Sequence, residues 1–143
     1  MTRRQNKRAT PEALIAAAVA AARYAYAPYS EYPVGAALLA ASGQVYTGCN
    51  VENAAYPATI CAERTALVKA VSEGQRRFEA LAVATGSGGA PCGLCRQMLY
   101  EFAPDLTVYI ADFDGRLLHT AALTELLALG FGPAHLARAE AAG

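Results

Sequence analysis

Two short stretches, CAER at residues 61–64 and PCGLCR at residues 91–96, dominate the interpretation of this sequence. Each is followed by a run that favours a helix, from residue 62 to 71 after the first and to Phe102 after the second. A helix N-terminus carries partial positive charge and unpaired N–H groups. A cysteine at that position is therefore biased towards the thiolate, the form that binds a metal ion.

The spacing of the cysteines indicates one zinc ion per chain. Cys92 and Cys95 are separated by two residues, which suits two ligands of a tetrahedral ion. With Cys61 as the third ligand, the fourth position stays open for water, as in catalytic zinc sites. Glu63, two residues after Cys61, is expected to carry protons to and from that water. We interpret the pattern as a zinc hydrolase that acts on an amino-substituted ring.

Two residues near these stretches have alternative interpretations. Cys49 would turn the site into a closed, structural one if it were a fourth ligand, but its spacing of two from Thr47 and Val51 also fits a packed strand. Arg64 is expected to donate hydrogen bonds to the sulfurs and offset their negative charge. Its alternative is an ordinary solvated helix residue.

Length and charge limit the possible partners. The 143 residues, 55% of them hydrophobic, predict a single folded domain over residues 10–143. Of twelve basic residues, four lie in the first eight positions, so we interpret residues 1–9 as a mobile basic arm. The remaining body has eight basic against twelve acidic residues, which disfavours nucleic acid as a partner.

The N-terminal region also resembles a secretory signal peptide, because an alanine-rich run follows the basic arm. Alanine favours a helix over insertion, and Thr10 followed by Pro11 is a typical helix start. No apolar run reaches the roughly 20 residues that span a membrane, and export would expose the metal-binding thiols to oxidation. The sequence therefore predicts a cytoplasmic protein without a membrane partner.

Hydrophobic periodicity and turn residues predict nine elements in the order α-β-β-α-β-α-β-β-α. The expected helices cover residues 11–26, 62–71, 92–102 and 123–129, and the expected strands cover residues 34–41, 44–50, 80–85, 107–111 and 117–119. This order implies an α/β fold, a three-layer α-β-α sandwich with a mixed five-stranded sheet between helices.

Longer stretches resemble the small, homotetrameric cytidine deaminases. The matching stretches are NVENAAY (50–56), CAER (61–64), PCGLCRQ (91–97), YS (29–30), VGAA (34–37) and FGP (131–133). The resemblance covers about residues 11–136 and implies a cytidine deaminase-like fold. It also implies hydrolytic deamination of cytidine and deoxycytidine to uridine, deoxyuridine and ammonia in pyrimidine salvage. In that reaction a zinc-bound hydroxide attacks C4, and Glu63 shuttles the protons.

The resemblance also implies roles for substrate-binding residues. Asn50 and Glu52 would hydrogen-bond the ribose hydroxyls, and the backbone N–H of Ala62 would read the pyrimidine carbonyl. Phe131 would reach into the site of a neighbouring subunit to pack on the base, with Tyr56 at the same boundary. The implied assembly is a homotetramer with shared active sites.

Four positions depart from the family pattern. Tyr32 stands where phenylalanine is usual, which adds a hydroxyl near the nucleoside pocket, and Pro57 stands where serine is common. Ala122 and Ala128 replace a usual threonine and a frequent proline before the C-terminal aromatic residue. None of the four is a predicted catalytic group.

Three competing functions share parts of the pattern. A deaminase of a nucleoside antibiotic such as blasticidin S would keep the zinc chemistry, but the NVEN stretch at residues 50–53 argues against it. A nucleic-acid editing deaminase is disfavoured by the acidic body. A non-enzymatic zinc module is disfavoured by Glu63 and the open metal position.

Overall fold

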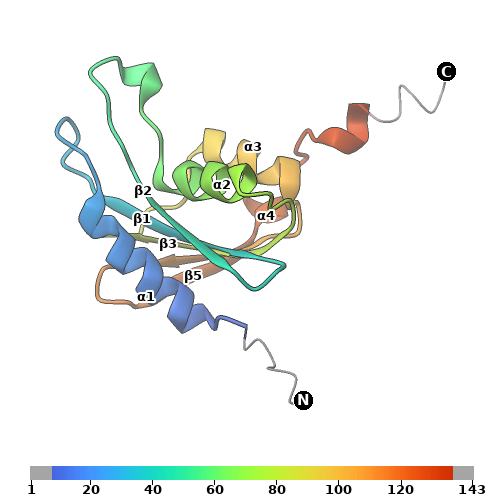
Figure 1. The fold of residues 1–143 in the computed structure, drawn as a ribbon, viewed down its shortest axis with the longest axis horizontal. Coiled ribbons are helices and arrows are strands. Elements are labelled where there is room, and N and C mark those ends of the chain that lie inside the picture. Colours follow the sequence, from blue (N-terminus) through green and yellow to red (C-terminus); the bar gives the residue numbers. More distant parts are fainter. Residues whose placement is uncertain (1–7, 137–143) are drawn as a thin grey trace.

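The computed structural model describes residues 8–136 and contains one mixed five-stranded sheet with the strand order β2-β1-β3-β4-β5 (Figure 1). The helices are α1 (Pro11–Ala21), α2 (Ala62–Ser72), α3 (Gly93–Phe102) and α4 (Leu123–Leu126), with 3₁₀ turns η1 (Ala22–Tyr24) and η2 (Tyr56–Ala58). The strands are β1 (Val34–Ala40), β2 (Val45–Cys49), β3 (Phe78–Thr85), β4 (Thr107–Ala111) and β5 (Leu117–Ala122). The predicted element order and the mixed sheet are confirmed.

Only one pair of strands in the sheet is parallel. β1 pairs antiparallel with β2 and with β3, and β4 pairs antiparallel with β5, whereas β3 and β4 run parallel. A parallel pair needs a crossover connection, and here α3 supplies it. This crossover brings the N-terminus of α3 to the same side of the sheet as α2.

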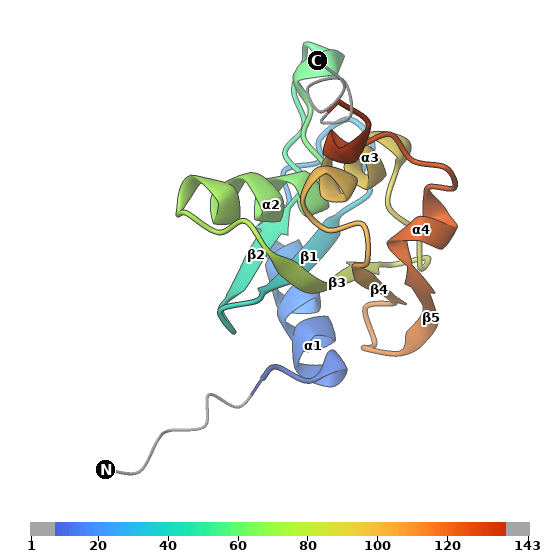
Figure 2. The same cartoon turned by 90° about the vertical axis from the view of Figure 1, so that its right-hand side faces the viewer.

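Helices cover both faces of the sheet, so the predicted three-layer sandwich is confirmed (Figure 2). α1 packs on one face through Leu14, Ile15 and Ala18, while α2, α3 and α4 pack on the other. A Cβ atom on Gly35 would lie only 1.8 Å from the carbonyl oxygen of Ala18. Glycine at this position therefore lets α1 lie directly against β1.

The first helix is shorter than predicted. Regular helix ends at Ala21, a 3₁₀ turn follows to Tyr24, and Tyr26 is already extended. The N–H of Tyr26 donates to the carbonyl of Asn50 at 2.9 Å, and the N–H of Glu52 donates to the carbonyl of Tyr26 at 2.8 Å. This tertiary pairing overrides the helical pattern of the local sequence.

The C-terminal boundaries also differ from the prediction. β5 continues to Ala122 instead of ending at His119, and α4 ends at Leu126 instead of residue 129. Leu129 has a φ of 53°, a backbone conformation that does not continue a helix. Most of the predicted N-terminal arm lies outside the described residues, but Arg8 forms an ion pair with Glu79.

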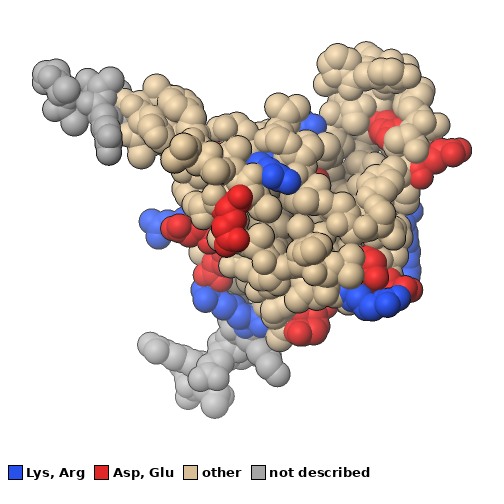
Figure 3. Space-filling model, turned by 180° about the vertical axis from the view of Figure 1, so that it is seen from behind, with Lys and Arg blue, Asp and Glu red and all other residues tan. Residues whose placement is uncertain are grey.

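The segment that carries η2 and the segment that follows α4 both project from the body (Figure 1). The surface is hollowed between the η2 segment and the rest of the chain (Figure 3). Within residues 8–136, no helix combines the length and apolar character needed to cross a membrane.

Candidate active site

Three sulfur atoms converge at the starts of two helices. Cys61 and Cys92 are the N-cap residues of α2 and α3, and Cys95 lies in the first turn of α3. The Sγ atoms of Cys61 and Cys92 are 3.7 Å apart, and those of Cys92 and Cys95 are 3.4 Å apart. Zn–S bonds of about 2.3 Å in a tetrahedral ion place the sulfurs about 3.8 Å from one another. The donor set and its spacing therefore fit one zinc ion.

The electrostatics of the cluster favour a cation. Hydrogen bonds from Cys95 and Arg64 lower the pKa of Cys61 to about 5. The pKa of Cys95 is raised by the same bond to Cys61, by burial and by the charge of Glu63. The charges of Cys61 and Glu63 thus oppose the loss of the proton from Cys95, which metal binding requires, and Arg64 is the cation beside them. Because one guanidinium does not balance three thiolates, a divalent metal ion suits this position.

Arg64 extends from the first turn of α2 towards the cluster. Its Nη2 lies 3.6 Å from the Sγ of Cys61 and donates to the carbonyl of Thr59 at 3.4 Å. Its Nε is buried and has no hydrogen-bond partner among the described residues. The guanidinium is therefore held against the sulfurs and is not a freely solvated group.

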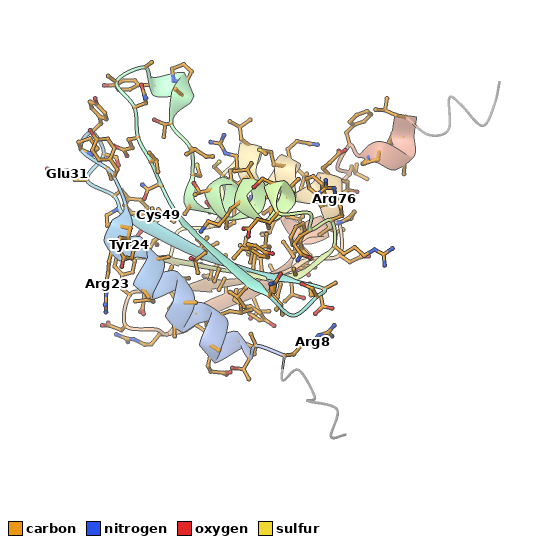
Figure 4. All side chains as sticks on the ribbon, in the orientation of Figure 1. Arg8, Arg23, Tyr24, Glu31, Cys49 and Arg76 are labelled. Atoms are coloured by element: carbon orange, nitrogen blue, oxygen red, sulfur yellow. The ribbon has the colours of Figure 1, made fainter. Side chains whose placement is uncertain are left out.

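Cys49 is not part of the sulfur cluster. It lies on β2 beside a different cavity, bounded by α1, η1, β2 and α2, that Tyr24 and Lys69 also line (Figure 4). Among the described residues, the group suited to a metal consists of Cys61, Cys92 and Cys95 alone. The alternative of a closed site with four cysteines is not supported.

Glu63 is buried next to the sulfurs. Its Oε2 lies 3.6 Å from the Sγ of Cys95, and the side chain is only 4% exposed. Burial raises the pKa of Glu63, and the negative charge of Cys61 raises it further. A raised pKa brings a carboxyl group closer to the range that general acid–base catalysis uses.

A cavity of about 420 Å³ joins the sulfur cluster to the predicted nucleoside-binding residues. It is lined by Ser30, Tyr32, Val34, Asn50, Glu52, Thr59, Cys61, Glu63, Val83, Thr85, Gly89, Ala90 and Cys92. Ala62, the first residue of α2, is fully buried between Cys61 and Glu63. The fold therefore collects the catalytic and sugar-binding candidates of one chain around one space.

Asn50 is fixed at the end of β2 by backbone groups of a neighbouring segment. Its Oδ1 accepts from the N–H of Val34 at 2.9 Å, and its Nδ2 donates to the carbonyl of Tyr32 at 2.8 Å. An amide has two N–H groups and two lone pairs on oxygen. One of each remains for a ligand.

Glu52 is fixed by the turn that follows residue 28. Its Oε1 accepts from the N–H groups of Tyr29 at 2.9 Å and Ser30 at 3.1 Å, and its Oε2 accepts from the Ser30 hydroxyl. The Ser30 hydroxyl bond, with the two backbone bonds, holds the pKa of Glu52 below its usual value despite desolvation. Glu52 is thus a carboxylate at neutral pH.

The two aromatic candidates lie outside the cavity of their own chain. Tyr56 on η2 is 71% exposed, and its ring meets that of Tyr29 edge-on at 5.7 Å. Phe131 is 55% exposed and stacks on His135 at 5.2 Å. The carbonyl of Phe131 accepts from the Nε2 of Gln97 at 2.9 Å, which ties this segment to α3.

Sequence reasoning gave no role to several residues of the cavity. Ser30 was noticed only within a matching stretch, yet it binds Glu52. Thr85 is a buried polar residue at the end of an apolar strand, and its hydroxyl accepts from the N–H of Gly89 at 2.7 Å. A polar residue that ends an apolar strand is the signal that would have found Thr85. Gly89 and Ala90 carry no comparable signal.

Comparison with known proteins places these observations in a family. Residues 8–111 match the family described as the cytidine and deoxycytidylate deaminase zinc-binding region. The chain is 52% identical over 112 residues to a cytidine deaminase of Sporosarcina psychrophila, covering 76% of this chain and 82% of that protein. It is 50% identical over 105 residues to a cytidine deaminase of Halalkalibacterium halodurans, covering 71% and 80%.

Solved structures similar to this chain indicate the same family. The crystal structure of a cytidine deaminase from Burkholderia pseudomallei superposes with a TM-score of 0.81 at 46% identity, covering 85% of this chain and 99% of that one. A cytidine deaminase from Mycobacterium tuberculosis gives a TM-score of 0.74 at 41% identity, covering 83% and 94%. With the matched region, the identities and the cysteine cluster taken together, the chain belongs to the cytidine and deoxycytidylate deaminase family.

Proposed function

We propose that this protein is a zinc-dependent hydrolase that deaminates cytidine and deoxycytidine to uridine and deoxyuridine, releasing ammonia, in pyrimidine salvage. The observation that carries the proposal is the single cavity in which Glu63 and the cysteines lie with Asn50 and Glu52. The proposed catalytic groups and the proposed sugar-binding groups thereby face one cavity, which a single small molecule could enter. The relatives named above, called cytidine deaminases, support the choice of substrate.

Cys61, Cys92 and Cys95 would hold the zinc ion. When bound, zinc supplies Lewis acidity, which makes water a nucleophile at neutral pH. Glu63 would accept the two protons of the attacking water in turn, passing the first to the ring nitrogen and the second to the leaving amine, which departs as ammonia. Its burial beside Cys95 supports this role, because a carboxyl group shielded from solvent keeps the proton it carries. Arg64 offsets the negative charge of the thiolates.

Asn50 and Glu52 would bind the ribose hydroxyls. Each side chain is already oriented by bonds to neighbouring segments, and each keeps hydrogen-bonding capacity for a ligand. The backbone N–H of Ala62, at the start of α2, would donate to the pyrimidine carbonyl, where the helix N-terminus favours a partial negative charge. Tyr32 contributes to the wall of the same cavity.

We further propose a cytoplasmic homotetramer with shared active sites. Phe131 and Tyr56 are exposed on projecting segments, and an aromatic residue so placed suits a contact with a neighbouring subunit. The cytoplasmic location is supported by the three metal-binding thiols, which need a reducing compartment.

The enzymatic proposal is tested by ultraviolet assays of purified, zinc-loaded protein. We expect turnover of cytidine and deoxycytidine, and none of blasticidin S. Glu63→Gln protein prepared in parallel controls for a contaminating deaminase. Turnover of blasticidin S alone would transfer the assignment to the antibiotic deaminases.

The shared site is tested by mixing inactive Glu63→Gln chains with impaired Phe131→Ala chains and exchanging subunits. Because a Glu63→Gln chain keeps Phe131, it can complete the site of a Phe131→Ala neighbour. We expect activity above the sum of the separate proteins. No recovery, with subunit exchange verified by mass, would assign Phe131 to its own chain.

A further inference from the structure

A tyrosine and a serine that are far apart in sequence meet at the rim of the cavity. The hydroxyl of Tyr32 and the Oγ of Ser87 are 2.6 Å apart, although 55 positions separate the residues. Ser87 belongs to the segment 86–90, here called the glycine loop, which connects β3 to the cysteine-bearing start of α3. Tyr32, Gly89 and Ala90 all line the cavity. The hydrogen bond therefore joins the two segments that carry these lining residues.

Tyr32 is itself anchored to the nucleoside-binding groups. Its N–H donates to the Oγ of Ser30 at 3.1 Å, and Ser30 in turn binds Glu52. Its carbonyl accepts from the Nδ2 of Asn50 at 2.8 Å. These bonds involve the backbone of Tyr32, so the position of the ring is set without its hydroxyl.

The glycine loop is held near its C-terminal end by hydrogen bonds, and Gly88 in its middle lies close to the side chain of Leu118. The buried hydroxyl of Thr85, the residue before the loop, accepts from the N–H of Gly89. Beyond its end, the Nε of Arg96 donates to the carbonyl of Pro91 at 2.7 Å. The bond between Ser87 and Tyr32 is the hydrogen bond, among the described residues, that joins the loop to the segment of Tyr32.

Gly89 provides the space that the tyrosine hydroxyl occupies. A Cβ atom at position 89 would lie 2.8 Å from the hydroxyl oxygen of Tyr32, closer than real Cβ contacts. The next nearest atoms, Cζ of Tyr32 and Oγ1 of Thr85, would both be at an ordinary 3.8 Å. The absence of a side chain at 89 and the hydroxyl at 32 are thus matched features of this chain.

We propose that Tyr32 is a positioning residue whose hydroxyl holds the glycine loop against the nucleoside side of the cavity. Its hydroxyl forms a hydrogen bond with Ser87 and does not bind the substrate. The wall formed by Gly89 and Ala90, which Pro91 separates from Cys92, is thereby set before the nucleoside binds. The role in catalysis rests on the proposed deamination of cytidine.

The expected kinetic effect is confined to binding. Without the bond, the nucleoside has to order the glycine loop when it binds, so KM rises. The turnover number is unchanged, because Cys61, Cys92 and Glu63 are positioned by α2 and α3 and not by the loop. A general loss of folding would instead lower the active fraction, and hence the apparent kcat.

The test compares Tyr32→Phe, Ser87→Ala and the double variant in steady-state assays with cytidine and in amide hydrogen exchange over residues 86–90. Each single variant should raise KM about two- to tenfold, the worth of one hydrogen bond, and should speed exchange of the loop. The double variant should equal the single variants, because all three lack the same bond. Tyr24→Phe, a change on an exposed side chain outside the cavity, is the matched control.

Three results would overturn the proposal: unchanged KM and exchange in both single variants, additive effects in the double variant, or a lower kcat at constant KM. If the unmodified protein does not deaminate cytidine, the proposed function fails. The exchange measurement then still decides whether Tyr32 holds the loop.

Discussion

The two ends of the cavity are built in different ways. At the sulfur end, Cys61 and Cys92 are the N-cap residues of α2 and α3, so two helices set the positions of their side chains. At the nucleoside end, Asn50 and Glu52 lie in irregular segments and hydrogen-bond the backbone of residues 29–34. The sulfur end thus depends on where two helices start, whereas the nucleoside end depends on the side chains that are also its functional groups.

This difference determines what a substitution does at each end. Replacement of a group at the sulfur end removes its chemistry, and the helix that carries it still has its own hydrogen bonds. Replacement of Glu52 removes a group proposed to bind the sugar. It also removes the carboxylate that accepts hydrogen bonds from Tyr29 and Ser30 in the neighbouring turn. At the sulfur end, the zinc ligands are the exception, because the ion joins two helices. For Glu63, effects on chemistry and on local structure should separate, whereas for Glu52 they should coincide.

The largest effect is expected from removal of a zinc ligand. Cys92→Ser should lose the metal, all activity and part of the thermal stability, because the ion joins the starts of α2 and α3. Cys49→Ser is the matched control and should keep both metal and activity. Metal content per chain and thermal unfolding are the measurements. Loss of zinc from the Cys49→Ser protein would instead support a closed site in which Cys49 is the fourth ligand.

Glu63→Gln changes the sulfur end without replacing a metal ligand. The variant should keep zinc and bind nucleoside but lose turnover by about 10²–10⁴-fold, since the amide cannot carry the proton. Its thermal stability should not fall, because the buried carboxyl is replaced by a neutral group of the same shape. Single-turnover kinetics and equilibrium binding separate the two properties. Near-normal kcat would remove Glu63 from the proton path.

Glu52→Gln examines the nucleoside end. It should raise KM for cytidine by about an order of magnitude, because charge-assisted hydrogen bonds are lost, and it should also lower the melting temperature. Glu31→Gln makes the same charge change on an exposed side chain nearby and controls for charge alone. A rise in KM without any change in stability would mean that the two ends do not differ as described.

The stability effect of Glu52 should depend on pH. Its pKa is lowered in the folded state, so the carboxylate stabilises the fold above the ordinary glutamate value of about 4.5. That contribution disappears as the pH falls through the folded-state pKa. Melting temperatures of the unmodified protein and of Glu52→Gln should differ at neutral pH and converge in acid. A difference between the two melting temperatures that grows as the pH falls would contradict the stabilising role of the Glu52 carboxylate.

The smallest effect is expected at the rim between the two ends. Gly89→Ala should raise KM by about severalfold, since a Cβ atom displaces the Tyr32 hydroxyl. In a Tyr32→Phe background, Gly89→Ala should not raise KM further, because the hydroxyl oxygen that the Cβ atom would displace is absent. Kinetics of the two single variants and the double variant provide the test. An equal penalty in both backgrounds would show that the alanine acts elsewhere.

Local patterns account for much of the fold and for the sulfur end of the site. The order of the elements followed from periodicity and turn residues, and the helix starts at Cys61 and Cys92 followed from the runs behind them. The end of α1 could not be predicted, because Tyr26 leaves the helical pattern to pair with the segment 50–52.

The nucleoside end was less predictable, for the same reason. Glu52 binds Ser30 across 22 positions, and Tyr32 binds Ser87 across 55. No local pattern encodes which segments the fold brings together. Phe131 and Tyr56 were proposed only from a family resemblance, and their exposure in a single chain is what a role at a neighbouring subunit requires.

The parallel pairing of β3 with β4 also affects the order in which the chain folds. β1 and β2 are joined by a tight turn and can pair early, whereas β4 reaches β3 only through the crossover that contains α3. Closing that longer loop costs entropy before its contacts form, so this half of the sheet should form later. Cys92 and Cys95 belong to the crossover, and therefore meet Cys61 late. We expect metal binding to follow the folding barrier and to act mainly by slowing unfolding.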